Sequence, residues 1–77
     1  MKRFIIRSND DGSLWVAPHR WLFGDCFKAT AFSSAFYAKQ TVKFEQKSRR
    51  GREQLPQVYE LLENGELRFV SEEECAK

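Results

Sequence analysis

Apolar and polar residues alternate at the start of the chain in the pattern of a β-hairpin over about residues 2–17. The turn-forming dipeptide Asp11-Gly12 separates the two predicted strands. A tight turn at this dipeptide would pair Arg7 with Val16 across the hairpin. Since side chains of a strand alternate between faces, this register places Trp15 on the same face as Phe4 and Ile6 of the first strand.

A second hairpin is predicted over about residues 57–71, where two β-prone segments flank Asn64-Gly65. This dipeptide is preferred in the two-residue type I′ turn, because both central positions of that turn have positive φ angles. The resulting register puts four apolar residues on one face of the hairpin. We expect this face to join the core: Val58, Leu62, Leu67 and Phe69.

The segment between the hairpins carries apolar residues at helical spacing, every three or four positions: Ala31, Ala35, Ala38 and Val42. This spacing predicts a helix over about residues 32–47, with Ser33 or Ser34 suited to cap its N-terminus. The stretch Thr41–Glu45 also alternates as a strand would, so a strand is the alternative there. We favour the helix.

These elements follow one another in the order ββαββ. This order predicts a single small α+β domain over residues 1–77, with an antiparallel sheet and one helix packed on one face. A chain of 77 residues leaves no room for a second domain. The linker over residues 18–30 contains Trp21-Leu22-Phe23, and we expect it to fold beneath the helix.

The sequence also bears on where the protein resides. It has no apolar run of the ~20 residues that a membrane span needs. The apolar stretch near the N-terminus is interrupted at Arg7, so it lacks the core of a secretory signal peptide. Two cysteines, Cys26 and Cys75, are too few for the disulfide framework of a small secreted domain, and we interpret both as reduced thiols. The sequence therefore predicts a cytoplasmic protein with no membrane partner.

Candidate catalytic residues are sparse. His19 is the only histidine, and a dyad with Cys26, assisted by Asp25, has the residue types of a nucleophile and its base. No family motif surrounds these residues. Neither the spacing of cysteine and histidine nor any glycine-rich loop indicates a metal or phosphate site. We therefore predict that the protein is not an enzyme and uses no cofactor, metal or small-molecule substrate.

Positive charge is concentrated in the middle of the chain. The net charge is only +2, but residues 39–52 hold six cations against one acid, Glu45. Most of these cations fall in a predicted basic loop over residues 47–54, and an acidic tail follows at residues 72–77. We expect partner contacts from this patch and from two residues of the linker: Lys39, Lys43, Lys47, Arg49, Arg50, Arg52, Arg20 and Trp21.

The Ala/Ser-rich segment Ala31-Phe32-Ser33-Ser34-Ala35-Phe36-Tyr37-Ala38-Lys39 lies between the two predicted hairpins. In size and layout the chain resembles small phage or prophage accessory proteins, anti-CRISPR inhibitors among them. The resemblance implies a single-domain inhibitor that acts by steric or charge contacts on a nucleic-acid-handling machine. It assigns no functional residue.

The expected function is that of a non-enzymatic binding module. Its partner is expected to be a protein or a protein–nucleic-acid complex, contacted through the basic patch. The alternative is direct, sequence-nonspecific binding of nucleic acid through phosphate contacts. The acidic end of the chain favours the first reading, because a nucleic-acid-binding domain is usually strongly basic throughout.

Overall fold

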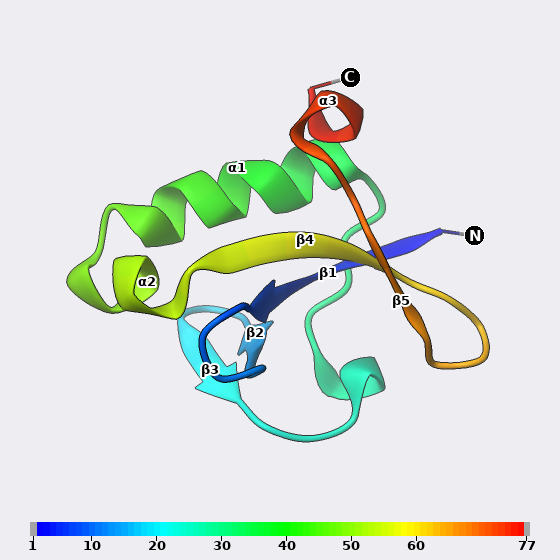
Figure 1. Ribbon diagram of the computed structural model, residues 1–77, viewed down its shortest axis with the longest axis horizontal. Coiled ribbons are helices and arrows are strands. Elements are labelled where there is room, and N and C mark those ends of the chain that lie inside the picture. Colours follow the sequence, from blue (N-terminus) through cyan, green and yellow to red (C-terminus); the bar gives the residue numbers. More distant parts are fainter. Residues whose placement is uncertain (1, 77) are drawn as a thin grey trace.

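The computed structural model describes residues 2–76, apart from the side chains of residues 50 and 51. Five strands, three α-helices and one 3₁₀ helix follow one another along this part of the chain (Figure 1). In chain order they are β1 (Arg3–Ser8), β2 (Leu14–Val16), β3 (Arg20–Leu22), η1 (Cys26–Lys28), α1 (Ala35–Gln46), α2 (Arg49–Gln54), β4 (Pro56–Leu61), β5 (Leu67–Phe69) and α3 (Glu72–Cys75).

The strands form one antiparallel sheet in the order β3-β2-β1-β4-β5, and α1 lies across one face of it (Figure 1). The predicted α+β class is therefore confirmed, while the order ββαββ is only approximate. The predicted linker over residues 18–30 is wrong in part, because it contains β3 and η1. Trp21 does pack beneath the helix as expected, but it does so from a strand, and the prediction is wrong for Leu22 and Phe23, which are exposed.

Strand β1 is central and is covered on both faces. Ile5 and Ile6 are each 0% exposed, although they point to opposite sides of the sheet. Ile6 packs with Ala38 and Val42 of α1. Ile5 packs with Ala29, next to η1, which lies on the side of the sheet away from α1 in Figure 1. The chain thus builds a second, smaller core that the sequence pattern did not indicate.

The first hairpin has a longer turn than predicted. Arg7 pairs with Leu14, two positions before the expected partner Val16. The loop is closed by the Ser8 hydroxyl, which accepts hydrogen bonds from the backbone N–H groups of Asp10 and Asp11, and Gly12 has a positive φ of 78°. Because the shift is an even number of residues, the predicted faces survive, and Trp15 does join the core beneath α1.

The second hairpin is shifted by one residue, and the predicted core face is therefore wrong for β5. Leu61 pairs with Leu67, because the turn is centred on Glu63-Asn64 and closed by a hydrogen bond from the Gly65 N–H to the Leu62 carbonyl. Gly65, with φ of 88°, supplies the left-handed residue that follows such a turn. An odd shift exchanges the two faces, so Val70 rather than Phe69 packs with Val58 under the helix.

The central segment is a helix, as favoured, and the strand alternative for residues 41–45 is excluded. Helix α1 begins at Ala35, where the Ser34 hydroxyl caps the Phe36 N–H, and it is shorter than the predicted range of 32–47. Phe32 instead forms a backbone bridge to Phe4 of β1, with N–H to carbonyl distances of 2.7 and 2.9 Å. The face turned to the sheet carries Ala38, Val42 and Glu45.

The predicted basic loop and acidic tail both contain helices. Residues 49–54 form α2, which packs against α1, and Glu72–Cys75 form the single turn of α3, capped by Ser71. Three glutamates occupy the first turn of α3, where the positive end of the helix dipole favours negative charge. Cys75 anchors this turn, since its side chain is buried in the core beneath α1.

The two thiols are expected to differ in reactivity. Burial raises the pKa of the Cys75 thiol above its ordinary value, whereas the Cys26 side chain is only partly covered. Because the thiolate is the reactive form, we expect Cys75 to react on the order of tenfold or more slowly than Cys26 with an aromatic disulfide reagent in the native protein. Cys26→Ser should leave only the slow phase. Equal rates for the two thiols in the folded protein would contradict this burial.

Candidate functional site

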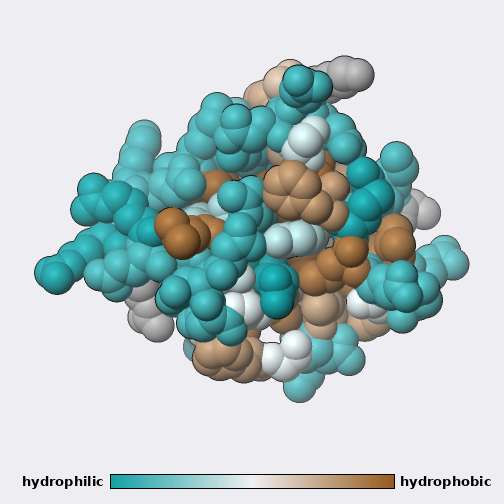
Figure 2. All heavy atoms as spheres, in the orientation of Figure 1, coloured by the Kyte–Doolittle hydropathy of each residue, from teal (hydrophilic) through white to brown (hydrophobic). Residues whose placement is uncertain are grey.

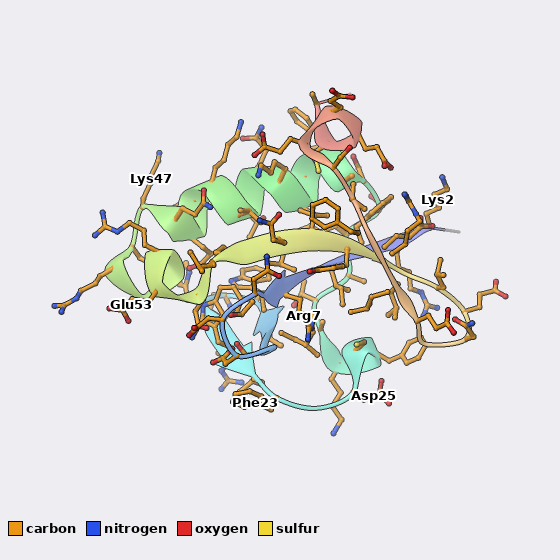
Figure 3. The ribbon with its side chains drawn as sticks, viewed as in Figure 1. Lys2, Arg7, Phe23, Asp25, Lys47 and Glu53 are labelled. Atoms are coloured by element: carbon orange, nitrogen blue, oxygen red, sulfur yellow. The ribbon has the colours of Figure 1, made fainter. Side chains whose placement is uncertain are left out.

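Four of the eight predicted partner-binding residues lie at one end of the molecule. This end, which we call the basic end, is formed by β3, the C-terminal part of α1, and α2. Its exposed cations are Arg20, Lys47, Arg49 and Arg52, whereas Lys43 lines a groove between α1 and α3 together with Glu72 and Glu73. Hydrophilic side chains cover the surface over α2 and the end of α1 (Figure 2), and Lys47 projects outward there (Figure 3).

The positive charge of the basic end is only weakly compensated. Arg49 has an ion pair with Glu53, but the N–O distance is 3.6 Å and both side chains are largely exposed. Such a pair contributes little and leaves the guanidinium free to change partners. Glu45, the acid next to these cations in the sequence, is 4% exposed and faces inward. The exposed cations Lys47, Arg49 and Arg52 therefore outnumber the exposed acid Glu53 on the end of α1 and on α2.

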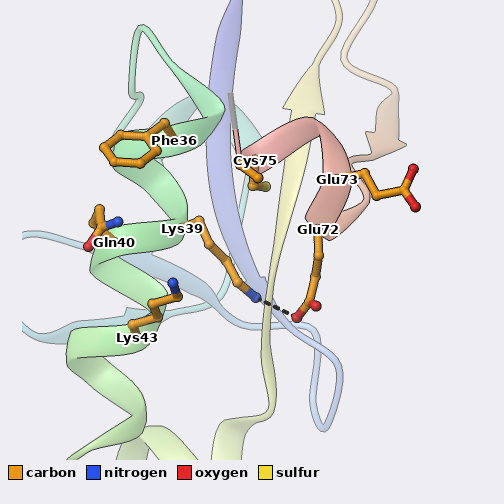
Figure 4. A pocket seen from close by; sticks show the side chains of 8 residues that line it. Phe36, Lys39, Gln40, Lys43, Glu72, Glu73 and Cys75 are labelled. Atoms are coloured by element: carbon orange, nitrogen blue, oxygen red, sulfur yellow. Dashed lines mark hydrogen bonds and ion pairs between the residues drawn. The ribbon is translucent and has the colours of Figure 1, made fainter.

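Two other predicted residues, Trp21 and Lys39, do not belong to this surface either. Trp21 is 8% exposed, because in β3 it alternates with the outward-facing Arg20 and Leu22 and points into the core. Lys39 donates to a Glu72 carboxylate oxygen at 3.1 Å and helps to fasten α3 to α1 (Figure 4). For Arg50, the predicted contact lies outside the described side chains.

A hollow of about 420 Å³ lies beside the basic end, between α1 and β3. Six residues line it: His19, Trp21, Phe44, Glu45, Lys47 and Ser48. The buried Trp21 and Glu45 lie deepest, whereas His19, Phe44 and Lys47 are exposed and stand at the rim. The rim thus combines two flat rings with a cation.

The buried carboxylate of Glu45 holds the His19 ring in place. Its Oε1 accepts the indole N–H of Trp15 at 2.8 Å and lies 2.8 Å from Nδ1 of His19. A carboxylate accepts hydrogen bonds, so Nδ1 of His19 is the donor to Glu45 Oε1. The same ring stacks on Phe44, with centroids 5.6 Å apart and planes at 23°.

The sequence analysis did not identify Glu45 and Phe44 as parts of this site. The signal was present, because Glu45 is the only acid among the cations of residues 39–52. A single acid within a basic stretch suggests that its carboxylate has a hydrogen-bond partner inside the fold. Its partners, Trp15 and His19, lie 30 and 26 residues away, so only the sheet could bring them together.

Acidic side chains gather at the opposite end of the molecule, near β5 and α3. Arg68 donates to Glu60 at 2.8 Å and to Glu74 at 3.0 Å. Its hydrogen bond holds the pKa of the Glu74 carboxyl below the ordinary value. Helices α2 and α3 lie at different ends of the fold (Figure 1), so the charge asymmetry of the sequence becomes an asymmetry in space.

The catalytic dyad considered from the sequence does not form. His19 bonds to Glu45 on the helix side of the sheet, whereas Cys26 packs against the cluster around Ile5 on the other side. Within residues 2–76, no group of three His, Cys, Asp or Glu side chains is placed to hold a metal ion. Among the helices described, none has the length and apolar character to cross a membrane.

Comparisons with protein-family models, curated proteins and solved structures give no match to this chain. The geometry of the basic end is therefore the basis for assigning a function.

Proposed function

We propose that the protein is a non-enzymatic binding module that contacts the anionic surface of a protein or a protein–nucleic-acid complex through its basic end. The observation that carries the proposal is the segregation of charge. Lys47, Arg49 and Arg52 project from one end, where the ion pair between Arg49 and the exposed Glu53 is weak. Such a field attracts and orients an anionic partner.

The inhibitor role implied by the resemblance to phage accessory proteins would use the same surface. A module of 77 residues acts on a larger machine by covering an anionic contact site rather than by chemistry. In this proposal the acidic end, around α3, faces away from the partner, because like charges repel.

The proposal is tested by charge-matched triple variants on immobilised heparin, a polyanion without bases. Lys47→Ala/Arg49→Ala/Arg52→Ala is expected to elute at clearly lower salt than the wild type. The control, Lys2→Ala/Arg3→Ala/Lys28→Ala, removes the same charge from exposed positions elsewhere. It should elute near the wild type, since contacts with polyanions are local and salt-dependent.

Equal shifts for the two triple variants would contradict the proposal, because they would show that only net charge matters. An unchanged elution of the first variant would contradict it as well. Circular dichroism of both variants checks that the helices and the sheet are retained.

A further inference from the structure

We propose that the basic end binds single-stranded nucleic acid, with a base stacked on the Phe44–His19 ring pair and the neighbouring phosphates held by Lys47 and the cations around it. This inference rests on the proposed function and names the chemistry of the partner for the same surface. Exposed aromatic rings set among cations are the usual means by which proteins bind a single strand.

The two rings of the Phe44–His19 pair are largely exposed to solvent. Phe44 is 59% exposed and the His19 side chain is 60% exposed, although the two rings stack on each other. The planes are close to parallel, so a third flat ring can continue the stack. Elsewhere on α1, the aromatic pair Phe36 and Tyr37 meets edge to face instead, at 77°, and does not line this hollow.

The His19 ring of this pair is held in place from its buried side by Glu45. Glu45 is anchored by Trp15, which is itself buried, and it fixes the orientation of the His19 ring through Nδ1. A surface that is ordered before binding loses less conformational entropy when the ligand arrives. The buried carboxylate thus acts as a positioning group for the exposed ring.

Lys47 and the cations of α2 lie near the Phe44–His19 ring pair, where a nucleic-acid strand stacked on this pair would carry its phosphates. Lys47 follows Phe44 by three residues, at the C-cap of α1, and lines the hollow itself. Residues three apart lie on the same side of a helix, so Lys47 stands beside the ring. Arg49 and Arg52 extend the positive surface along α2.

The ring pair favours a single strand over the other anionic partners. In a duplex the base faces are stacked on each other and are not accessible to a protein ring. An acidic protein surface would match the cations but would leave the open rings without a flat partner. A volume of about 420 Å³ is within the range of pockets that take a small ring system.

The test compares two labelled probes by fluorescence anisotropy at low salt: an oligodeoxythymidylate of about 15 nucleotides and an abasic strand of the same length. Stacking of one base corresponds to roughly fivefold or more in affinity. We expect the protein of residues 1–77 to prefer the strand with bases by at least this factor. Phe44→Ala should remove the preference while changing the affinity for the abasic strand by less than about twofold.

Two further variants separate the stacking role from a structural one. Tyr37→Ala removes an exposed ring from the same helix but away from the hollow, and it should leave both affinities unchanged. Phe44→Leu keeps an apolar contact with His19 without a flat ring, and it should also lose the preference for bases. A similar weakening on both probes in Phe44→Ala would overturn the inference.

Three other outcomes would also overturn it: equal affinity for the two strands in the wild type, tighter binding to the corresponding duplex, or equally tight binding to polyglutamate. The failure of this inference is distinguishable from the failure of the proposed function. Heparin carries no bases, so the triple variants still report on the basic end when base stacking is absent.

Discussion

Replacing Ile5 by Ala is expected to lower the free energy of unfolding by about 2–5 kcal/mol, as much as the same change at Ile6. Both side chains are completely buried, but on opposite faces of β1. A sheet covered by a helix on one side only would leave Ile5 near solvent, and its truncation would then be cheap. The expected equality therefore tests whether the second core around Ile5 exists.

Urea unfolding followed by tryptophan fluorescence measures both changes, since Trp15 and Trp21 are buried. Leu22→Ala is the control, because this exposed truncation should cost less than about 0.5 kcal/mol. If either alanine variant fails to fold, Ile→Val at the same position should still cost about 0.5–1.5 kcal/mol. A loss at Ile6 without one at Ile5 would contradict the two-sided core.

Replacing Glu45 by Ala is expected to destabilise the protein by about 2 kcal/mol. The change leaves the indole N–H of Trp15 buried without its acceptor, and an unpaired buried donor costs about 1–3 kcal/mol. It also releases the His19 ring from its hydrogen bond.

Glu45→Gln is the matched control, because its amide oxygen can still accept the Trp15 N–H in a side chain of the same shape. We expect less than half of the alanine loss in urea unfolding. His19→Ala should cost less than Glu45→Ala, because His19 is mostly exposed and the contact between Trp15 and Glu45 remains. Equal losses for Glu45→Ala and Glu45→Gln would show that the hydrogen bonds of Glu45 do not stabilise the fold.

The two hairpins show how much of this fold the sequence can predict. Alternation identified the strands of both, but the register depends on the turn, and turns of different length share the same residues. Glycine in a left-handed conformation serves a two-residue turn or ends a longer one, as Gly12 and Gly65 do here. The register error of two residues at the first turn left the side chains on their predicted faces. The register error of one residue at the second turn moved the side chains of β5 to the opposite face.

Short elements were the least predictable. Strand β3 has only three residues and is stabilised by its pairing with β2. This pairing leaves no pattern in the local sequence that would predict the strand. Helix α2 was interpreted as a loop because its cations repel one another, yet contact with α1 holds it in place. The long helix α1 was predicted because its buried stripe repeats over several turns.

The candidate site, like the fold, could be predicted from the sequence only in part. The concentration of cations is visible in the sequence, and Lys47, Arg49 and Arg52 are all exposed in the structure, at the C-cap of α1 and in α2. The Phe44–His19 ring pair could not be predicted from the sequence. Phe44 and His19 are 25 positions apart, and their contact depends on the turn between β2 and β3 and on the buried acceptor Glu45.

The salt dependence of oligodeoxythymidylate binding tests the account most directly. For a single strand, the logarithm of the affinity falls with the logarithm of salt concentration by about 0.7 for each phosphate contact. Lys47→Ala/Arg49→Ala/Arg52→Ala is therefore expected to flatten the slope by roughly 2 relative to the wild type, while the triple variant at Lys2, Arg3 and Lys28 keeps the wild-type slope. The same slope in all three proteins would contradict binding through the basic end, and no binding at low salt would contradict the binding of a single strand.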